Sequence, residues 1–227
     1  MPLDMGKLAA SILSADFARL GEQVKAVEPH ADMFHVDVMD GHFVPVLSIG
    51  PLVIDALDRV TDRPLHAHLM VDGPVTLFDD LASAGTDMAT CHIEAVRDDP
   101  AAPIKEARAR GMAAGLAVNP DTPIEALFPF LDDLDTIIVM SVHPGWAGQE
   151  FLESALPKIE RARAEIDRRG LAVDIEVDGG IDIESGKRAI EAGATVLAAA
   201  SSIFKAPDPA SAIAELAEVA RGGATDG

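Results

Sequence analysis

The chain has 227 residues, of which 48% are apolar and 25% are charged, and its formal net charge at pH 7 is −20. This charge argues against proteins that bind nucleic acid or an anionic membrane surface, because both need a basic face, and no apolar run reaches the ~20 residues of a membrane span. Cys91 is the single cysteine, so no intrachain disulfide can form. Since the start of the chain also lacks a signal-peptide pattern, we expect a cytoplasmic protein.

Segments with strand character alternate along the chain with segments of helical character, without a long linker. Runs of β-branched and apolar residues predict eight strands, at 8–13, 33–39, 65–71, 88–95, 113–119, 136–142, 173–178 and 195–201. Apolar residues at helical spacing, together with caps and terminal glycines, predict eight helices, at about 17–27, 50–60, 74–84, 101–110, 124–131, 151–169, 184–192 and 208–221.

This alternation is typical of parallel βαβ units. Eight rounds favour closure into a (β/α)8 TIM barrel over an open doubly wound sheet. We therefore expect an α/β protein in which residues 1–227 form a single barrel domain and 222–227 a flexible tail. In such barrels the active site lies at the C-terminal ends of the strands.

Polar side chains stand near three of these strand ends. His35 and Asp37 alternate on one strand and therefore share a face, His68 lies on the next strand, and Asp178 ends the seventh. For the first pair alone, a core histidine and a helix-capping aspartate would be an equal interpretation. Together the four residues form a plausible metal set that suits Zn²⁺, Fe²⁺, Mn²⁺ or Co²⁺.

Three further polar residues near strand ends receive other roles. We expect His42 and His92 to form hydrogen bonds in loops or in the barrel lining rather than to bind metal. The Asp40-Gly41 pair favours a turn in which the aspartate caps backbone N–H groups.

Small residues follow strands six to eight, where barrels commonly bind phosphate through backbone N–H groups. They occupy 145–148, 179–180 and 199–202, and no Lys or Arg lies within these loops, Lys205 being the nearest. A phosphate would therefore be held mostly by backbone donors, although ordinary turn glycines are an equal interpretation of each loop taken separately.

Five segments resemble the ribulose-phosphate 3-epimerase family in order and spacing, over about residues 8–207. They are Ser11-Ile12-Leu13-Ser14-Ala15-Asp16-Phe17, His35-Val36-Asp37-Val38-Met39-Asp40-Gly41-His42-Phe43-Val44-Pro45, His68-Leu69-Met70-Val71, Pro144-Gly145 with Gly148-Gln149, and Glu176-Val177-Asp178-Gly179-Gly180. The resemblance implies a (β/α)8 barrel that interconverts D-ribulose 5-phosphate and D-xylulose 5-phosphate in the pentose phosphate pathway. It also implies one divalent metal ion per subunit and a homo-oligomer.

The resemblance assigns roles to individual residues of this chain. Metal ligands would be His35, Asp37, His68 and Asp178, and the acid/base pair would be Asp37 and Asp178. Inverting C3 needs one group to remove a proton from one face and another to return a proton to the opposite face. Sugar and phosphate contacts would come from Ser11, His68, Gly145, Trp146, Ala147, Gly148, Gly179, Gly180, Ala200 and Ser201.

A few positions depart from the family pattern and leave the substrate less certain than the reaction. Ala10, His143, Trp146, Ala147 and Ala200 replace residues more usual there. The alternatives are a 3-epimerase of a six-carbon ketose 6-phosphate, a metal-assisted lyase, or a sugar-phosphate binding protein without activity. The acid/base pair argues against a lyase, which needs no matched proton donor on the opposite face, and the retained metal ligands argue against a binder.

Overall fold

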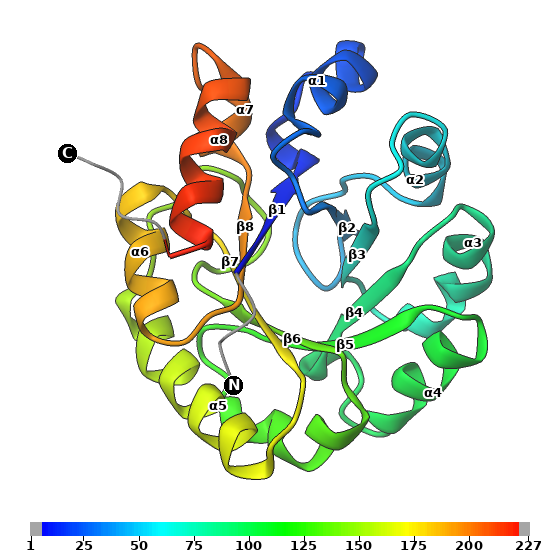
Figure 1. The fold of residues 1–227 in the computed structure, drawn as a ribbon. Helices are drawn as coiled ribbons and strands as arrows, with labels where there is room; N and C mark the ends of the chain where they lie inside the picture. Colours follow the sequence, from blue (N-terminus) through cyan, green and yellow to red (C-terminus); the bar gives the residue numbers. More distant parts are fainter. Residues whose placement is uncertain (1–5, 223–227) are drawn as a thin grey trace.

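The computed structural model describes residues 6–222, and the chain there forms a closed barrel of eight parallel strands surrounded by helices (Figure 1). Each strand pairs with its neighbours in sequence, and β8 pairs with β1. The strands are β1 Lys7–Ser11, β2 Met33–Met39, β3 Leu65–Met70, β4 Met88–His92, β5 Ala113–Val118, β6 Thr136–Met140, β7 Asp174–Asp178 and β8 Val196–Ala199. The predicted α/β barrel is confirmed.

The α-helices form the outer ring and cover the apolar outer face of the barrel. They are α1 Leu20–Val27, α2 Pro51–Asp58, α3 Phe78–Ser83, α4 Ala101–Ala109, α5 Leu156–Arg169, α6 Ile183–Glu191, α7 Ser201–Phe204 and α8 Pro209–Ala220. Five short 3-10 helices lie between strands and α-helices: η1 Ile12–Ser14, η2 Phe17–Arg19, η3 Pro74–Leu77, η4 Ile93–Ala95 and η6 Glu153–Ala155. A longer one, η5 Ile124–Asp133, takes the place of an α-helix between β5 and β6.

Several helix ends follow from local sequence. Pro51 occupies the first turn of α2, where its missing N–H costs no hydrogen bond. Asp16 caps η2 by accepting from the N–H of Ala18. Gly170 ends α5 in the left-handed region, with φ of 67°.

Several predicted boundaries were wrong. Strands six and eight end two residues earlier than expected, at Met140 and Ala199. The helices expected from residues 17 and 74 become α-helical only at Leu20 and Phe78, after 3-10 turns. The first strand ends at Ser11 instead of residue 13, and β4 ends at His92 instead of residue 95, because 3-10 turns begin directly after both. The predicted helix at 124–131 is the 3-10 helix η5, which contains Pro129. The helix predicted from residue 151 becomes α-helical only at Leu156, and α7 was not predicted.

Strand register brings the predicted site residues together. His35 pairs with His66 and Asp37 with His68 across β2 and β3, and Met140 pairs with Asp178 across β6 and β7. Because side chains alternate along a strand, these residues point into the barrel near its C-terminal end.

Two expectations concern the remainder of the chain. In the part that the structure describes, no helix is long and apolar enough to cross a membrane. The predicted tail lies, from residue 223 onward, outside the described residues.

Candidate metal and active site at the C-terminal rim

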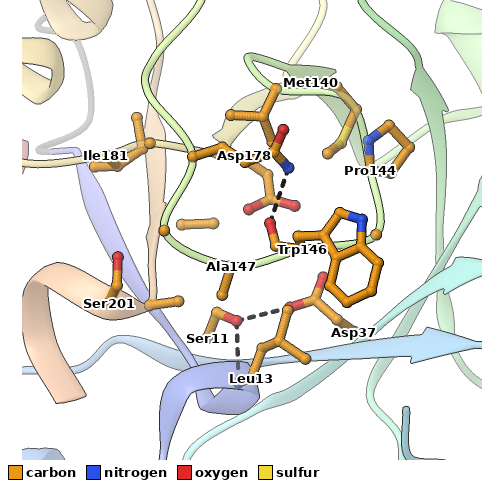
Figure 2. A pocket seen from close by; sticks show the side chains of 18 of the residues that line it. Ser11, Leu13, Asp37, Met140, Pro144, Trp146, Ala147, Asp178, Ile181 and Ser201 are labelled. Carbon is orange, nitrogen blue, oxygen red and sulfur yellow. Dashed lines mark hydrogen bonds between the residues drawn. The ribbon is translucent and has the colours of Figure 1, made fainter. Parts of the chain in front are cut away.

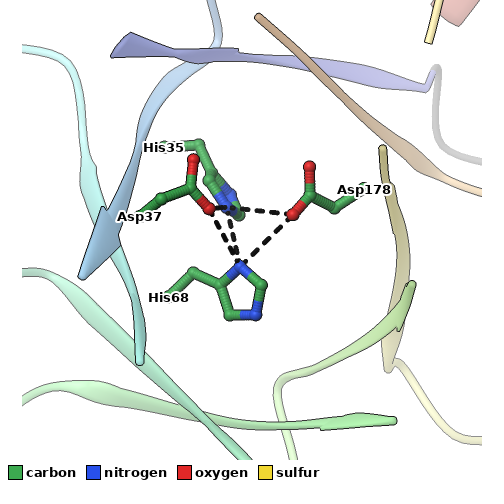
Figure 3. Close-up of side chains that lie close together, drawn as sticks. All are labelled: His35, Asp37, His68 and Asp178. Atoms are coloured by element: carbon green, nitrogen blue, oxygen red, sulfur yellow. Dashed lines mark hydrogen bonds and ion pairs between the residues drawn. The ribbon is translucent and has the colours of Figure 1, made fainter. Parts of the chain in front are cut away.

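Four side chains from three strands converge at the C-terminal end of the barrel (Figure 3). Asp37 Oδ1 lies 3.2 Å from His35 Nε2 and 3.2 Å from His68 Nδ1. Asp178 Oδ2 approaches the same two nitrogens from the other side, at 3.7 and 3.3 Å. The predicted set of two histidines and two aspartates is therefore one cluster in space.

The spacing within this cluster suits a metal ion. Ligand atoms about 2.1 Å from a common ion are about 3.4 Å from one another in a tetrahedron. Five of the six distances among the four facing atoms run from 3.1 to 3.7 Å, including 3.1 Å between His35 Nε2 and His68 Nδ1. Two nitrogens and two carboxylate oxygens also form a donor set that a divalent transition metal accepts. The four residues therefore fit a divalent transition-metal ion.

Charge dominates the protonation of this buried cluster. Burial acts to raise the pKa of Asp37, but the charge of His35 and hydrogen bonds from His35 and His68 hold it well below its usual range. Burial acts to lower the pKa of both histidines. The charges of Asp37 and Glu176 raise the pKa of His35 well above its usual value, and hydrogen bonds to the two aspartates raise that of His68.

A buried glutamate that the sequence analysis did not single out lies behind His35. Glu176 Oε1 is 2.7 Å from His35 Nδ1, and Glu176 Oε2 is 3.0 Å from Nδ1 of the buried His66. Because an ionised carboxylate only accepts, Nδ1 of His35 must donate, which leaves Nε2 as the nitrogen that faces the metal site. Strand alternation offered a signal, since Glu176 stands two residues before Asp178 on β7 and shares its face.

The residues expected to have other roles occupy other positions. Asp40 accepts from the N–H groups of His42, Phe43 and Asp72 at 2.8 to 2.9 Å, as expected of a turn cap. His42 Nδ1 lies 3.0 Å from the Asp40 carbonyl. His92 is buried in the barrel lining beside His68, and burial lowers its pKa to about 4, so its ring is neutral at pH 7.

A pocket opens above the cluster (Figure 2). Ser11 borders it and donates a buried hydrogen bond of 2.7 Å to Asp37 Oδ2. The side chain of Trp146, 63% exposed, covers one side. Apart from the two aspartates, the lining residues in the described part of the chain are uncharged, and they include Met39, Met70, Met140, Gly145, Ala147, Gly148, Gly179, Gly180, Ala200 and Ser201.

Two glycines of this wall are required by close packing. Gly179 has φ of 117°, and a Cβ there would meet Val142 Cγ2 at 2.3 Å. Gly180 has φ of 63°, and a Cβ would meet the backbone N of Phe151 at 2.5 Å. At both positions only glycine allows the loops after β6 and β7 to approach each other. Every predicted site residue lines the pocket or lies in the cluster below it. The residues at 145–148, 179–180 and 200–201 form one wall of the pocket.

Known proteins resemble this chain in sequence over most of its length. Residues 7–204 match the model of the ribulose-phosphate 3 epimerase family. The chain is 44% identical over 214 residues to ribulose-phosphate 3-epimerase of Bacillus subtilis, covering 93% of this chain and 98% of that protein. It is 46% identical over 208 residues to the chloroplastic ribulose-5-phosphate-3-epimerase of Arabidopsis thaliana, covering 91% and 74%.

Solved structures extend the likeness in fold. A crystal structure of KGPDC from Streptococcus mutans superposes with a TM-score of 0.76 at 17% identity, covering 96% of this chain and 99% of that chain. At this identity the likeness shows the barrel fold alone. The family match and the curated relatives carry the assignment: this chain belongs to the ribulose-phosphate 3-epimerase family and is an isomerase of the epimerase class.

Proposed function

We propose that the protein inverts C3 of D-ribulose 5-phosphate to give D-xylulose 5-phosphate, with Asp37 and Asp178 as the acid/base pair. The observation that carries the proposal is the placement of these two carboxylates on opposite sides of the facing histidine nitrogens, at the floor of one pocket. The relatives at 44–46% identity bear the name of this reaction.

The chemistry divides between the two aspartates. One starts ionised and removes the C3 proton, and the other starts protonated and returns a proton to the opposite face, so each turnover leaves the two carboxyl groups with their protonation exchanged. Ser11 donates to Asp37 and thereby favours the ionised form of that carboxylate. Asp37 is accordingly the better candidate for the group that removes the proton from ribulose 5-phosphate.

The remaining residues hold the substrate and exclude water. We assign the metal to His35, Asp37, His68 and Asp178; when a divalent ion is bound, its positive charge supplies electrostatic stabilisation for the enediolate oxygens. The three pocket methionines provide an apolar, adaptable wall beside the planar enediolate. Backbone N–H groups of the loops at 145–148, 179–180 and 200–201 are proposed to hold the phosphate, and Ser11 and His68 to contact the sugar.

The test follows C3 in deuterated solvent. The metal-loaded protein is incubated with D-ribulose 5-phosphate in D₂O, and NMR measures inversion and deuterium uptake at C3. Xylulose 5-phosphate carrying deuterium at C3 is the expected product. Exchange without inversion would refute the two-aspartate account, and no exchange in the presence of metal would refute the substrate and direct the assay to six-carbon ketose phosphates.

Substitutions separate the acid/base pair from a neighbouring aspartate. Asp37→Asn and Asp178→Asn should each abolish turnover, whereas Asp40→Asn, which changes only a turn cap, should keep an appreciable fraction. An Asp178→Asn variant with near-normal activity would refute the assignment.

A further inference from the structure

Serine side chains occupy the carbonyl groups of the loop that follows β7. Three consecutive carbonyl oxygens of this loop each lie 2.6 to 2.9 Å from a serine Oγ, and the pairs are Gly179 with Ser141, Gly180 with Ser185, and Ile181 with Ser202. Within residues 6–222 these serines are not among the residues that line the pocket. The carbonyl groups therefore point to the rear of the loop and not into the cavity.

Ser141, directly after β6, holds two successive peptide groups. Its backbone N–H donates to the oxygen of Asp178 at 2.8 Å, and its hydroxyl donates to the oxygen of Gly179 at 2.6 Å. The hydroxyl lies farther from the Asp178 oxygen, at 3.0 Å, so we assign its single proton to Gly179. Successive carbonyl groups of an ordinary strand point to opposite neighbours. Here both face one residue, which the φ of 117° at Gly179 allows.

The direction of these two carbonyl groups sets the direction of two N–H groups. In a trans peptide the carbonyl and the N–H of the next residue point in opposite directions. The N–H groups of Gly179 and Gly180 therefore both point away from Ser141, toward the β8 side, where Ala200 and Ser201 line the pocket. Neither donates a hydrogen bond to another residue in the described range 6–222. Successive N–H groups that point the same way form a concave site for an anion.

The peptide group between the two glycines needs an external contact to keep this direction. Glycine on both sides offers little steric resistance to its rotation. A rotated peptide would present the carbonyl oxygen of Gly179, with its partial negative charge, to the pocket and repel a phosphate. Ser141 has no exposed surface, so its hydroxyl is the donor that holds this carbonyl at the rear of the loop.

We propose that Ser141 is a positioning residue whose hydroxyl fixes the Gly179–Gly180 peptide so that the N–H of Gly180 faces the phosphate of the substrate. This inference rests on the phosphate site of the proposed function. It adds to that site a residue that does not touch the substrate. It also divides the labour within one residue, since the backbone N–H of Ser141 orients Gly179 and the side chain orients Gly180.

Ser141→Ala separates these two effects. The variant keeps the backbone N–H and loses the hydroxyl. In Zn²⁺-loaded protein labelled with ¹⁵N-glycine, inorganic phosphate should shift the amide signals of Gly179 and Gly180 in the wild type, and only that of Gly179 in the variant. A general loss of packing would disturb both signals alike. Ser141→Thr, which keeps a hydroxyl, should restore the response of Gly180.

Steady-state kinetics give a second measurement. In Ser141→Ala the inhibition constant of inorganic phosphate and the KM for D-ribulose 5-phosphate should both rise about 10- to 100-fold, as expected for one lost hydrogen bond to a charged group. kcat should change much less, because the phosphate contact is the same in the bound substrate and in the transition state. Ser83→Ala is the control and should match wild type, since that hydroxyl donates to a backbone carbonyl, that of Asp79, on α3.

The outcomes separate this inference from the proposed function. Thermal unfolding first verifies that the variant is folded; Ser141→Cys, with a weaker donor of similar size, carries the same expectation if the alanine variant does not fold. A folded variant in which Gly180 still responds and phosphate inhibits as in wild type would overturn the role of Ser141 alone. A wild-type protein in which phosphate shifts neither glycine would overturn the phosphate site of this loop, and the inference with it.

Discussion

Ser11→Ala tests whether the serine hydroxyl orients the proposed base or only contacts substrate. In the structure the hydroxyl donates to Asp37 at 2.7 Å, and both groups are buried. A hydrogen bond to a charged group contributes about 1.5–3 kcal/mol, which corresponds to about 10- to 150-fold in rate. We therefore expect kcat/KM to fall within that range.

The pH dependence has a definite sign. The hydroxyl stabilises the ionised form of Asp37, so its loss raises the pKa of that carboxyl. At a given acidic pH a larger fraction of the base is then protonated, and the acidic limb of the kcat/KM profile should move to higher pH. The shift should be visible in a coupled spectrophotometric assay at saturating metal.

A matched control separates this effect from a local change in packing. Ser14→Ala removes a buried hydroxyl at the other end of the same short 3-10 turn and should leave the acidic limb where it is. The reasoning would be refuted if Ser11→Ala raised KM alone, with kcat and the acidic limb unchanged. The hydroxyl would then serve substrate binding only.

Three further results are expected. Glu176→Gln should lower divalent-metal affinity about 10- to 100-fold in chelator competition, because one end of the amide cannot accept from a histidine; unchanged affinity would contradict this. Trp146 is the only tryptophan and the chain has no tyrosine, so emission should change when ribulose 5-phosphate fills the pocket and be absent in Trp146→Phe. Cys91 is buried, and burial raises the pKa of its thiol, so a thiol reagent at pH 8 should label it only after unfolding; rapid labelling of native protein would refute that.

The sequence predicted the barrel well because each strand is buried on both faces and therefore forms a short apolar run. It predicted strand ends less well because an apolar run does not reveal where pairing stops. Ile93 continues the apolar pattern of β4, yet the backbone turns there into η4. The same limit applies at η5, where apolar spacing suggested an α-helix and Pro129 interrupts the backbone hydrogen bonds.

The sequence predicted those site residues whose side chains point inward at strand ends. It did not predict contacts that depend on how neighbouring strands are aligned with each other. His35, Asp37, His68 and Asp178 could be collected by asking which side chains point inward at strand ends. The hydrogen bond between His68 and His92 could not, because it needs the edge-to-edge geometry of two rings on different strands. Glu176 was predictable in part: the alternation of side chains along β7 shows that it points into the barrel, but it does not show that His35 and His66 are its partners.

Among residues 6–222, no Lys or Arg lines the pocket, and this has a kinetic consequence. A sugar phosphate dianion that approaches a protein of net charge −20 meets a repulsive field until it is within contact distance of the backbone N–H groups proposed to hold its phosphate. Dissolved salt screens that field beyond about 10 Å at 0.1 M but screens the short-range contacts much less. Substrate capture by this protein should therefore become faster as ionic strength rises, opposite to the behaviour of enzymes that attract anions with a basic funnel.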